Sequence, residues 1–325
     1  MSGVVIKTRK LFPGRENRML AVLFGVLAGA IMPLQTSVNN RLRQSVGAPL
    51  LASFISFFVG TLTLIIATWI TSGHPYPALA NTAGHPWWIF TGGMLGVVLL
   101  TGNILLFPRV GSVQTVILPI SGQIIMGLII DSTGLAHSPQ APLSLIRILG
   151  AAAVLVGSLA AVGVFSKKSS SHTQTQGASI WLWRLFGVVM GMCQATQVAV
   201  NGYLGTILGS AIESALISFT VGTTALFILL LVTRTKWRGI DGAGEKNPWW
   251  MWIGGVIGAT VIFSTAYLGP VIGTGVTVVV MLLGMMLASL LIDAFGILGS
   301  PRRRIHIAQI LGLVVIIVGV SMIRI

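Results

Sequence analysis

The sequence contains two copies of one unit. When it is shifted by 162 positions, it aligns with itself without gaps. The matching stretches include Leu23-Phe24-Gly25-Val26 with Leu185-Phe186-Gly187-Val188, Gln35 with Gln197, Asn39 with Asn201, Ile55-Ser56-Phe57 with Ile217-Ser218-Phe219, and Pro86-Trp87-Trp88 with Pro248-Trp249-Trp250. Chance does not give this register along both halves, so the fold has to be one that a single unit can build twice.

The composition places both copies in a membrane. Of the 325 residues, 54% are hydrophobic and only 8% are charged, whereas soluble domains carry about 25% charged residues. A span needs about 20 apolar residues, and ten such runs are present. They cover residues 19–38, 48–70, 87–107, 111–131, 144–165, 181–200, 211–233, 249–269, 273–293 and 305–323. Runs this long and continuous predict helices rather than the shorter alternating strands of a barrel, hence an all-α membrane protein with ten transmembrane helices.

A polar segment divides the runs into two sets of five. We expect an N-terminal tail at 1–18, a first five-helix repeat at 19–165, a polar linker at 166–180 and a second five-helix repeat at 181–325. Because five is odd, the second repeat would enter the membrane from the opposite side and form an inverted repeat. Secondary transporters are often built this way, with a site at the repeat interface near the midplane.

Charge and motifs exclude several functions. The net charge of +14 could suggest nucleic acid, but the basic residues lie between apolar runs, so we expect a lipid bilayer and no nucleic acid as partner. Most of them follow the odd-numbered runs, which favours both termini outside. The single cysteine, Cys193, excludes an internal disulfide, and no cleavable signal peptide is expected. The five histidines lack metal-ligand spacing, and there is no P-loop or nucleophile elbow. We therefore expect no enzyme, metal or cofactor.

The repeated amides are the main candidate site. Gln35 and Asn39 are four positions apart and share a helix face, as do Gln197 and Asn201. Polar side chains within a membrane usually face a bundle or a wet cavity. Two interpretations stay open: the amides line a substrate path, or the asparagines cap helix ends while the glutamines hold helices together. Pro33 predicts a kink in the first copy only.

Other polar residues extend this site. Asn103, Gln114 and Gln123 lie in the third and fourth runs, and we add them as candidate substrate contacts. Glu213 is the only acid placed within an apolar run rather than at its end. It could exchange a coupling proton, or it could simply favour the dipole of a first helical turn.

Two further patterns predict structure rather than chemistry. Asp131 and Asp293 form a repeated pair at the ends of the fourth and ninth runs. A carboxylate at a C-terminus opposes the helix dipole, so we expect structural ions that pair with loop arginines such as Arg147 rather than caps. The G-x-x-x-G patterns at 92–96 and 254–258 predict close helix packing.

The first two runs carry a family resemblance. The stretches "LFGVLAGAIMPLQTSVNNRL" and "SFFVG" resemble the YdcZ-like branch of the drug/metabolite transporter superfamily, in its fused two-domain form. The resemblance implies an inner-membrane exporter whose helices 1–4 and 6–9 surround a central cavity, with helices 5 and 10 peripheral. Ten-helix relatives are commonly drawn with cytoplasmic termini, against the charge distribution. Small multidrug exporters of the superfamily use a glutamate in their first helix, and this chain has none in its first or sixth run.

Taken together, the patterns predict a secondary active transporter in the plasma (inner) membrane. It would export a small polar or amphipathic metabolite or drug by alternating access. The alternative is a non-transporting membrane scaffold or sensor, in which the amides only join helices. No feature of the sequence specifies an oligomeric state.

Overall fold

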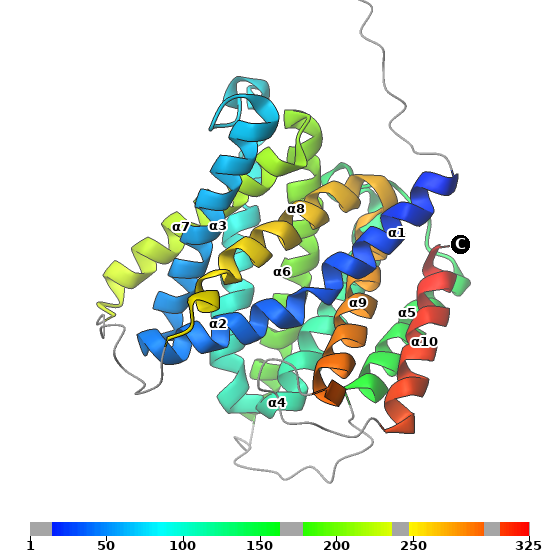
Figure 1. Cartoon of the computed structure of the whole chain (residues 1–325). Coiled ribbons are helices and arrows are strands. Elements are labelled where there is room, and N and C mark those ends of the chain that lie inside the picture. Colours follow the sequence, from blue (N-terminus) through cyan, green and yellow to red (C-terminus); the bar gives the residue numbers. More distant parts are fainter. Residues whose placement is uncertain (1–14, 163–177, 236–246, 296–305, 325) are drawn as a thin grey trace, which may run out of the picture.

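The computed structural model describes residues 15–162, 178–235, 247–295 and 306–324. Within these ranges the chain is helical, with short turns and no strand (Figure 1). The helices are α1 Arg15–Ala30, α2 Met32–Val46, α3 Pro49–Ser72, α4 Gly92–Thr133, α5 Leu145–Ala161, α6 Ala178–Leu208, α7 Ala211–Val232, α8 Gly254–Ile272, α9 Thr274–Phe295 and α10 Ile307–Arg324, with 3₁₀ turns η1 Leu79–Thr82, η2 Trp87–Phe90, η3 Leu135–His137 and η4 Trp249–Trp252.

Six stretches of the described chain are long and apolar enough to cross a membrane. They are Arg18–Val46, Pro49–Ser72, Gln114–Thr133, Ala211–Val232, Trp249–Ile272 and Thr274–Ile292. Two shorter apolar helices, Leu145–Ala161 and Ile307–Ile323, accompany them. The protein is therefore an all-α membrane protein. The polar linker and most of the N-terminal tail lie outside the described residues.

The two copies differ at the predicted proline. Helices α1 and α2 meet at Ile31, two positions before Pro33, whereas α6 continues unbroken through the equivalent Ala195. Proline has no backbone N–H, so the carbonyl four residues earlier loses its donor and the helix breaks. The predicted asymmetric kink is confirmed. Helix α2 also runs to Val46, beyond the predicted end of the first span at residue 38, so Asn39 lies inside the helix and does not cap it.

The element α4 reverses direction. A straight helix of its 42 residues would be about 63 Å long. Instead, Trp88 just before it and His137 just after it both stack on Tyr203 of α6. Leu106 and Leu118 likewise both approach Gly187. The predicted spans 87–107 and 111–131 correspond to two arms of α4, which run along α6 in opposite directions.

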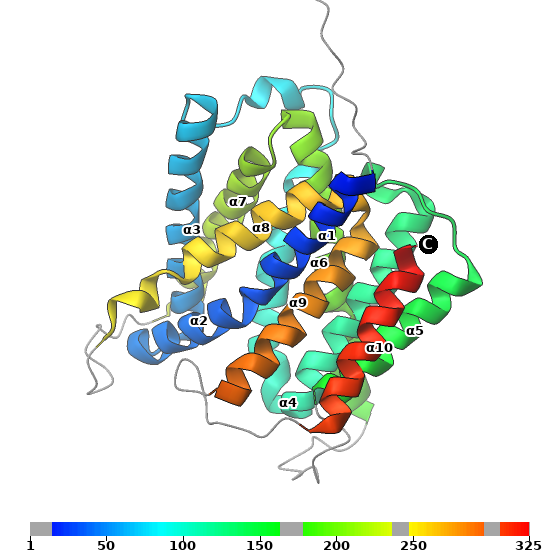
Figure 2. The ribbon, with the colours of Figure 1, turned by 45° about the vertical axis from the view of Figure 1, so that its right-hand side comes forward.

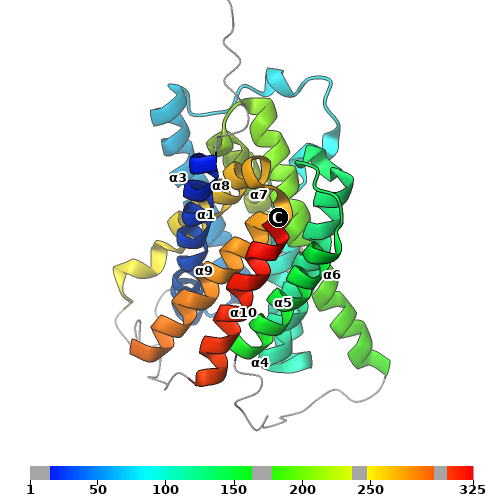
Figure 3. The ribbon, with the colours of Figure 1, turned by 90° about the vertical axis from the view of Figure 1, so that its right-hand side faces the viewer.

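The two repeats are interleaved. A Cβ atom added to Gly191 of α6 would collide with the carbonyl oxygen of Pro119 in the second arm of α4. At the equivalent position, one on Gly29 of α1 would collide with the carbonyl oxygen of Met281 in α9. The first helix of each repeat therefore packs directly on the fourth run of the other. Helices α5 and α10 lie side by side at one edge of the molecule (Figures 2 and 3).

Helices α3 and α7 are equivalent and pack antiparallel. Ser72, at the end of α3, donates a hydrogen bond of 2.8 Å to Glu213 at the start of α7. Near the middle, Thr61 and its equivalent Thr223 lie 2.9 Å apart through their hydroxyl oxygens. Two equivalent residues can touch each other only next to the local two-fold axis that relates the repeats. This axis therefore passes between α3 and α7.

A buried ion pair fixes the end of α4. Asp131 accepts hydrogen bonds from the backbone N–H groups of Thr274, at 2.8 Å, and Gly275, at 3.1 Å, which are the first residues of α9. Its other oxygen lies 3.2 Å from Arg147 Nη2, and the two side chains are only 1% and 4% exposed. The predicted pairing with Arg147 is confirmed. The prediction that Asp131 is not a cap is wrong, because it caps the N-terminus of a different helix. The side chain of Asp293 lies outside the described part of the structure.

We expect Asp131→Asn to lower the stability of the folded protein by about 3–5 kcal/mol, because Arg147 would stay buried without a counter-charge. Adding Arg147→Gln, the residue at the equivalent position 309, should recover part of the loss. Thermal unfolding of the detergent-solubilised full chain measures both. A single variant that melts at the wild-type temperature would contradict this role for the ion pair.

Candidate functional site

The amides of the first repeat pack on glycines of the second. A Cβ atom added to Gly254 of α8 would collide with Asn39 Oδ1, and one added to Gly258 would lie 2.5 Å from Gln35 Nε2. Both pairs of residues have a four-position spacing. The Q-x-x-x-N face of α2 thus fits onto the G-x-x-x-G face of α8, where only glycine leaves room.

The second repeat makes the equivalent contact, with its own amides packed on glycines of the first repeat. A Cβ atom added to Gly92 in the first arm of α4 would collide with Asn201 Oδ1 of α6. One added to Gly96 would lie 2.7 Å from Gln197 Nε2. We call these two contacts the amide–glycine joints. The sequence shows both patterns. However, the shift of 162 positions only tells which residues of the two repeats are equivalent, not which ones touch. The contact between the amides of one repeat and the glycines of the other could therefore not be predicted.

Each joint includes a serine from the helix that follows. Ser56 of α3 donates to Asn39 Oδ1 at 3.1 Å. Asn201 Nδ2 donates to the equivalent Ser218 of α7 at 3.2 Å. Asn201 Oδ1 is then buried without a hydrogen-bond partner. An unsatisfied buried oxygen costs about 1–3 kcal/mol. The asparagine oxygen of the second joint can therefore still accept a hydrogen bond, whereas that of the first joint already does.

Burial also separates the two joints. Gln197 and Asn201 are 5% and 1% exposed, whereas Gln35 and Asn39 are half-buried. The four amides therefore do not line one open cavity in this conformation. They hold α2 against α8 and α6 against α4, as expected if the glutamines hold helices together. Only Gln35 and Asn39 of the first repeat remain partly accessible.

A second polar contact lies between α4 and α6. Gln123 Nε2 donates to Gln194 Oε1 at 2.6 Å, and both side chains are half-buried. A carboxamide can make about four hydrogen bonds, so one mutual bond leaves both groups able to bind a ligand. The equivalent residues are Met285 and Met32. Sequence reasoning missed Gln194, although a glutamine within the apolar run 181–200 was a signal for it.

The remaining predicted residues fall elsewhere. Gln114 Oε1 accepts from Arg184 Nε at 3.0 Å. The side chain of Asn103 lies outside the described residues. Glu213 is the third residue of α7, where Ser210 caps the helix, and the carboxylate is 6% exposed. That first-turn position fits the helix-dipole interpretation.

Comparison with known proteins supports the resemblance seen in the sequence. A family model described as "Putative inner membrane exporter, YdcZ" matches twice, at residues 20–160 and 182–322. The inner membrane protein YdcZ of Escherichia coli K12 is 26% identical over 116 residues, which are 35% of this chain and 76% of that protein. A solved crystal structure superposes with a TM-score of 0.68 at 13% identity, over 95% of this chain and 98% of the other. That last similarity supports the fold alone.

The joints make a prediction about glycine. Gly92→Ala should destabilise the protein by about 1–3 kcal/mol, because the added methyl group displaces the buried Asn201. Adding Asn201→Ala should recover part of that loss by making room. Thermal unfolding in nanodiscs provides the measurement.

Gly205→Ala is the matched control, because the nearest atom to an added Cβ there lies 3.5 Å away. Alanine is favoured over glycine in a helix by about 1 kcal/mol, so this control should not lose stability. Equal effects of Gly92→Ala and Gly205→Ala would show that the joint is not tightly packed.

Proposed function

Because this inner-membrane protein belongs to the YdcZ family of exporters, we propose that it is a secondary active transporter that exports a small polar or amphipathic metabolite or drug. The family is a transporter class and not an enzyme class. The observation that carries the proposal is the half-buried Gln123–Gln194 pair between helices of opposite repeats. Polar groups at such positions in membrane proteins mark substrate paths by default.

We further propose ten spans arranged as two inverted five-helix repeats. Three observations support this arrangement. One family model matches both halves, the equivalent helices α3 and α7 run antiparallel where they touch, and α4 folds into two arms. Helix α1 begins and α10 ends on the same face of the molecule, as an even number of spans requires (Figure 1).

Alternating access would then move mixed units rather than the two repeats. The first helix of each repeat is locked by glycine–carbonyl contacts onto the other repeat, as at Gly29 and Gly191. A backbone contact this close cannot slide without separating the helices. The moving units would be α1 and α2 with α8 and α9, and α6 with the two arms of α4.

In this mechanism the substrate meets different chemistry on each unit. We propose that it contacts Gln123 and Gln194 on the α4–α6 unit and the methionines at positions 32 and 285 on the other. Methionine is flexible and polarisable and adapts to varied shapes. The half-buried Gln35 and Asn39 would contact the substrate next. Gln197 and Asn201 lie in the joint inside the α4–α6 unit, so movement of the two units alone would not expose them, and they would contact substrate only if α6 also separates from α4. Gln114 would extend the polar path along α4, and Asn103 stays a substrate contact predicted from the sequence.

Gln123→Met should abolish most transport while the protein still folds, since methionine stands at the equivalent position 285. The measurement is uptake or release of a broad metabolite panel by proteoliposomes under an imposed gradient in each direction. Gln44→Met, at an exposed position of α2, is the control and should transport normally.

The scaffold or sensor alternative gives a different result in the same assay. Wild-type protein would then move no compound, and Gln35→Leu with Asn39→Ala would unfold the protein rather than change any flux. If those two substitutions instead preserve folding and remove transport, the amides serve the substrate.

We also propose a proton as the coupling ion, with Glu213 as its carrier. Ser72 of α3 donates a hydrogen bond of 2.8 Å to this buried carboxylate. Protonation of Glu213 would therefore change the contact between α3 and α7, which belong to different repeats. Glu213→Gln, which cannot titrate, should remove the dependence of transport on the pH gradient while leaving exchange across equal pH intact. A pH dependence that survives this substitution would exclude Glu213 as the proton carrier.

A further inference from the structure

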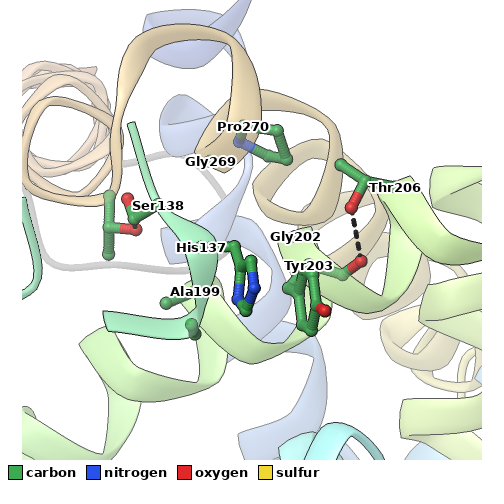
Figure 4. Close-up of a pocket in the computed structure, with 10 residues that line it drawn as sticks. His137, Ser138, Ala199, Gly202, Tyr203, Thr206, Gly269 and Pro270 are labelled. Carbon is green, nitrogen blue, oxygen red and sulfur yellow. Dashed lines mark hydrogen bonds between the residues drawn. The ribbon is translucent and has the colours of Figure 1, made fainter. Parts of the chain in front are cut away.

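A recess lies near the end of α6, on residues that flank Asn201 of the second amide–glycine joint. With His137 in place its volume is about 10 Å³, which is room for about one water molecule. Both repeats contribute to it, and Figure 4 shows the imidazole of His137 and the phenol ring of Tyr203 side by side at its centre. The lining residues are Ala136, His137, Ser138, Ala199, Gly202, Tyr203, Thr206, Gly269, Pro270 and Thr274.

Tyr203 is the centre of an aromatic stack. The His137 ring lies parallel to it, with centroids 4.1 Å apart and an angle of 7°, and the Trp88 ring stacks at 5.6 Å and 25°. His85 Nδ1 lies 3.3 Å from the phenol oxygen. Tyr203 is half-buried, whereas His137 is exposed, so the imidazole is a cover that can move into solvent.

The turn that carries His137 is strained. Ala136 and His137 have φ angles of 52° and 56°, in the left-handed region that non-glycine residues avoid. Such a conformation costs about 1–3 kcal/mol per residue, and it is found at ligand clamps and switches. A rearrangement of this turn that carries His137 away would relieve that strain and expose one face of the Tyr203 ring.

The lining selects for a neutral ligand. The hydroxyl groups of Ser138 and Thr274 are buried and hydrogen-bonded to each other at 3.0 Å, whereas the exposed Thr206 donates to the Tyr203 carbonyl and its oxygen can still accept a hydrogen bond. None of the ten lining residues is an acid, a lysine or an arginine. The nearby Asp131 is already engaged by Arg147 and by the N-terminus of α9. A cation or an anion would find no counter-charge there, whereas a ring with a hydroxyl or N–H group would find both stacking and hydrogen bonds.

We propose that this recess binds a small neutral molecule with a planar ring, which stacks on Tyr203 in place of His137. The recess itself has room for about one water molecule, so the ring would occupy the space that the His137 imidazole leaves, which limits the ligand to a small ring system. The stack is present only once, because the other repeat has no aromatic residue at the equivalent positions. The residues equivalent to Tyr203, His85 and His137 are Arg41, Asn247 and Gly299. It goes beyond the proposed function, since binding can be measured without transport.

The test uses the full chain in nanodiscs and two probes with the same carbon skeleton. These are 2-naphthol, which has planar rings, and decahydro-2-naphthol, which has none. Saturation-transfer NMR gives the dissociation constants. We expect saturable binding of 2-naphthol and at least fivefold weaker binding of the saturated probe, because ring stacking adds to area burial.

Variants assign the binding to the stack. Tyr203→Leu should weaken 2-naphthol binding about fivefold, Tyr203→Phe should retain it, and His137→Ala should strengthen it by removing the competing ring. Tyr267→Leu is the matched control, at a tyrosine of α8 that is 47% exposed on the outer surface, and it should bind as wild type does.

Three results would overturn the proposal: equal binding of the two probes, unchanged binding in folded Tyr203→Leu, or weaker binding in His137→Ala. Should Tyr203→Leu fail to fold, the other two variants still decide. Proteoliposomes that move no compound while 2-naphthol binds as expected would refute the transporter and leave this site intact. Transport without ring binding would do the reverse.

Discussion

The close approach of helix backbones across the two repeats is the constraint on which the rest of the structure depends. In lipid there is no hydrophobic force to press helices together, so packing has to come from small residues that let backbones touch. Gly191 lies on the Pro119 carbonyl and Gly29 on the Met281 carbonyl. These contacts connect the first helix of each repeat to the other repeat, and each hydrophobic cluster of the described residues combines side chains from both repeats.

The same contacts decide where the amides can point. Once α2 is held against α8, and α6 against α4, the faces with Q-x-x-x-N and G-x-x-x-G meet at equal spacing. A carboxamide there gains a shape-matched surface on glycine and a hydrogen bond from serine, as Asn39 does from Ser56. The joint is therefore a consequence of helix packing, and polar contact with a substrate is an additional role that only the accessible amides can have.

Features that depend on neighbours in the chain could be predicted from the sequence. The helical class, the polar divider and the break beside Pro33 all follow from periodicity and from the chemistry of proline. The reversal within α4 was foreseen as two apolar runs. Helix ends were less accurate, because α2 and α6 extend past the apolar runs into polar residues that pack on the other repeat.

Features that depend on distant residues could not be predicted. Asp131 was read against the dipole of its own helix, yet its partners are the N–H groups of Thr274 and Gly275, more than 140 positions away. The Gln123–Gln194 bond and the ring stack on Tyr203 also join different repeats. An internal repeat tells which residues are equivalent, but only the fold tells which ones touch.

The places where the copies diverge carry the strongest argument for function. Symmetric packing would be satisfied by keeping every contact twice, and the glycine–carbonyl contacts and amide–glycine joints are kept twice. By contrast, the positions equivalent to Gln123 and Gln194 in the other repeat are methionines, and the position equivalent to Tyr203 is Arg41. A half-buried pair of amides and a strained, stacked histidine each cost free energy that the other copy does without. Local costs of this kind are expected at functional positions, so the polar pair and the aromatic recess are where a directional process could act on an otherwise symmetric frame.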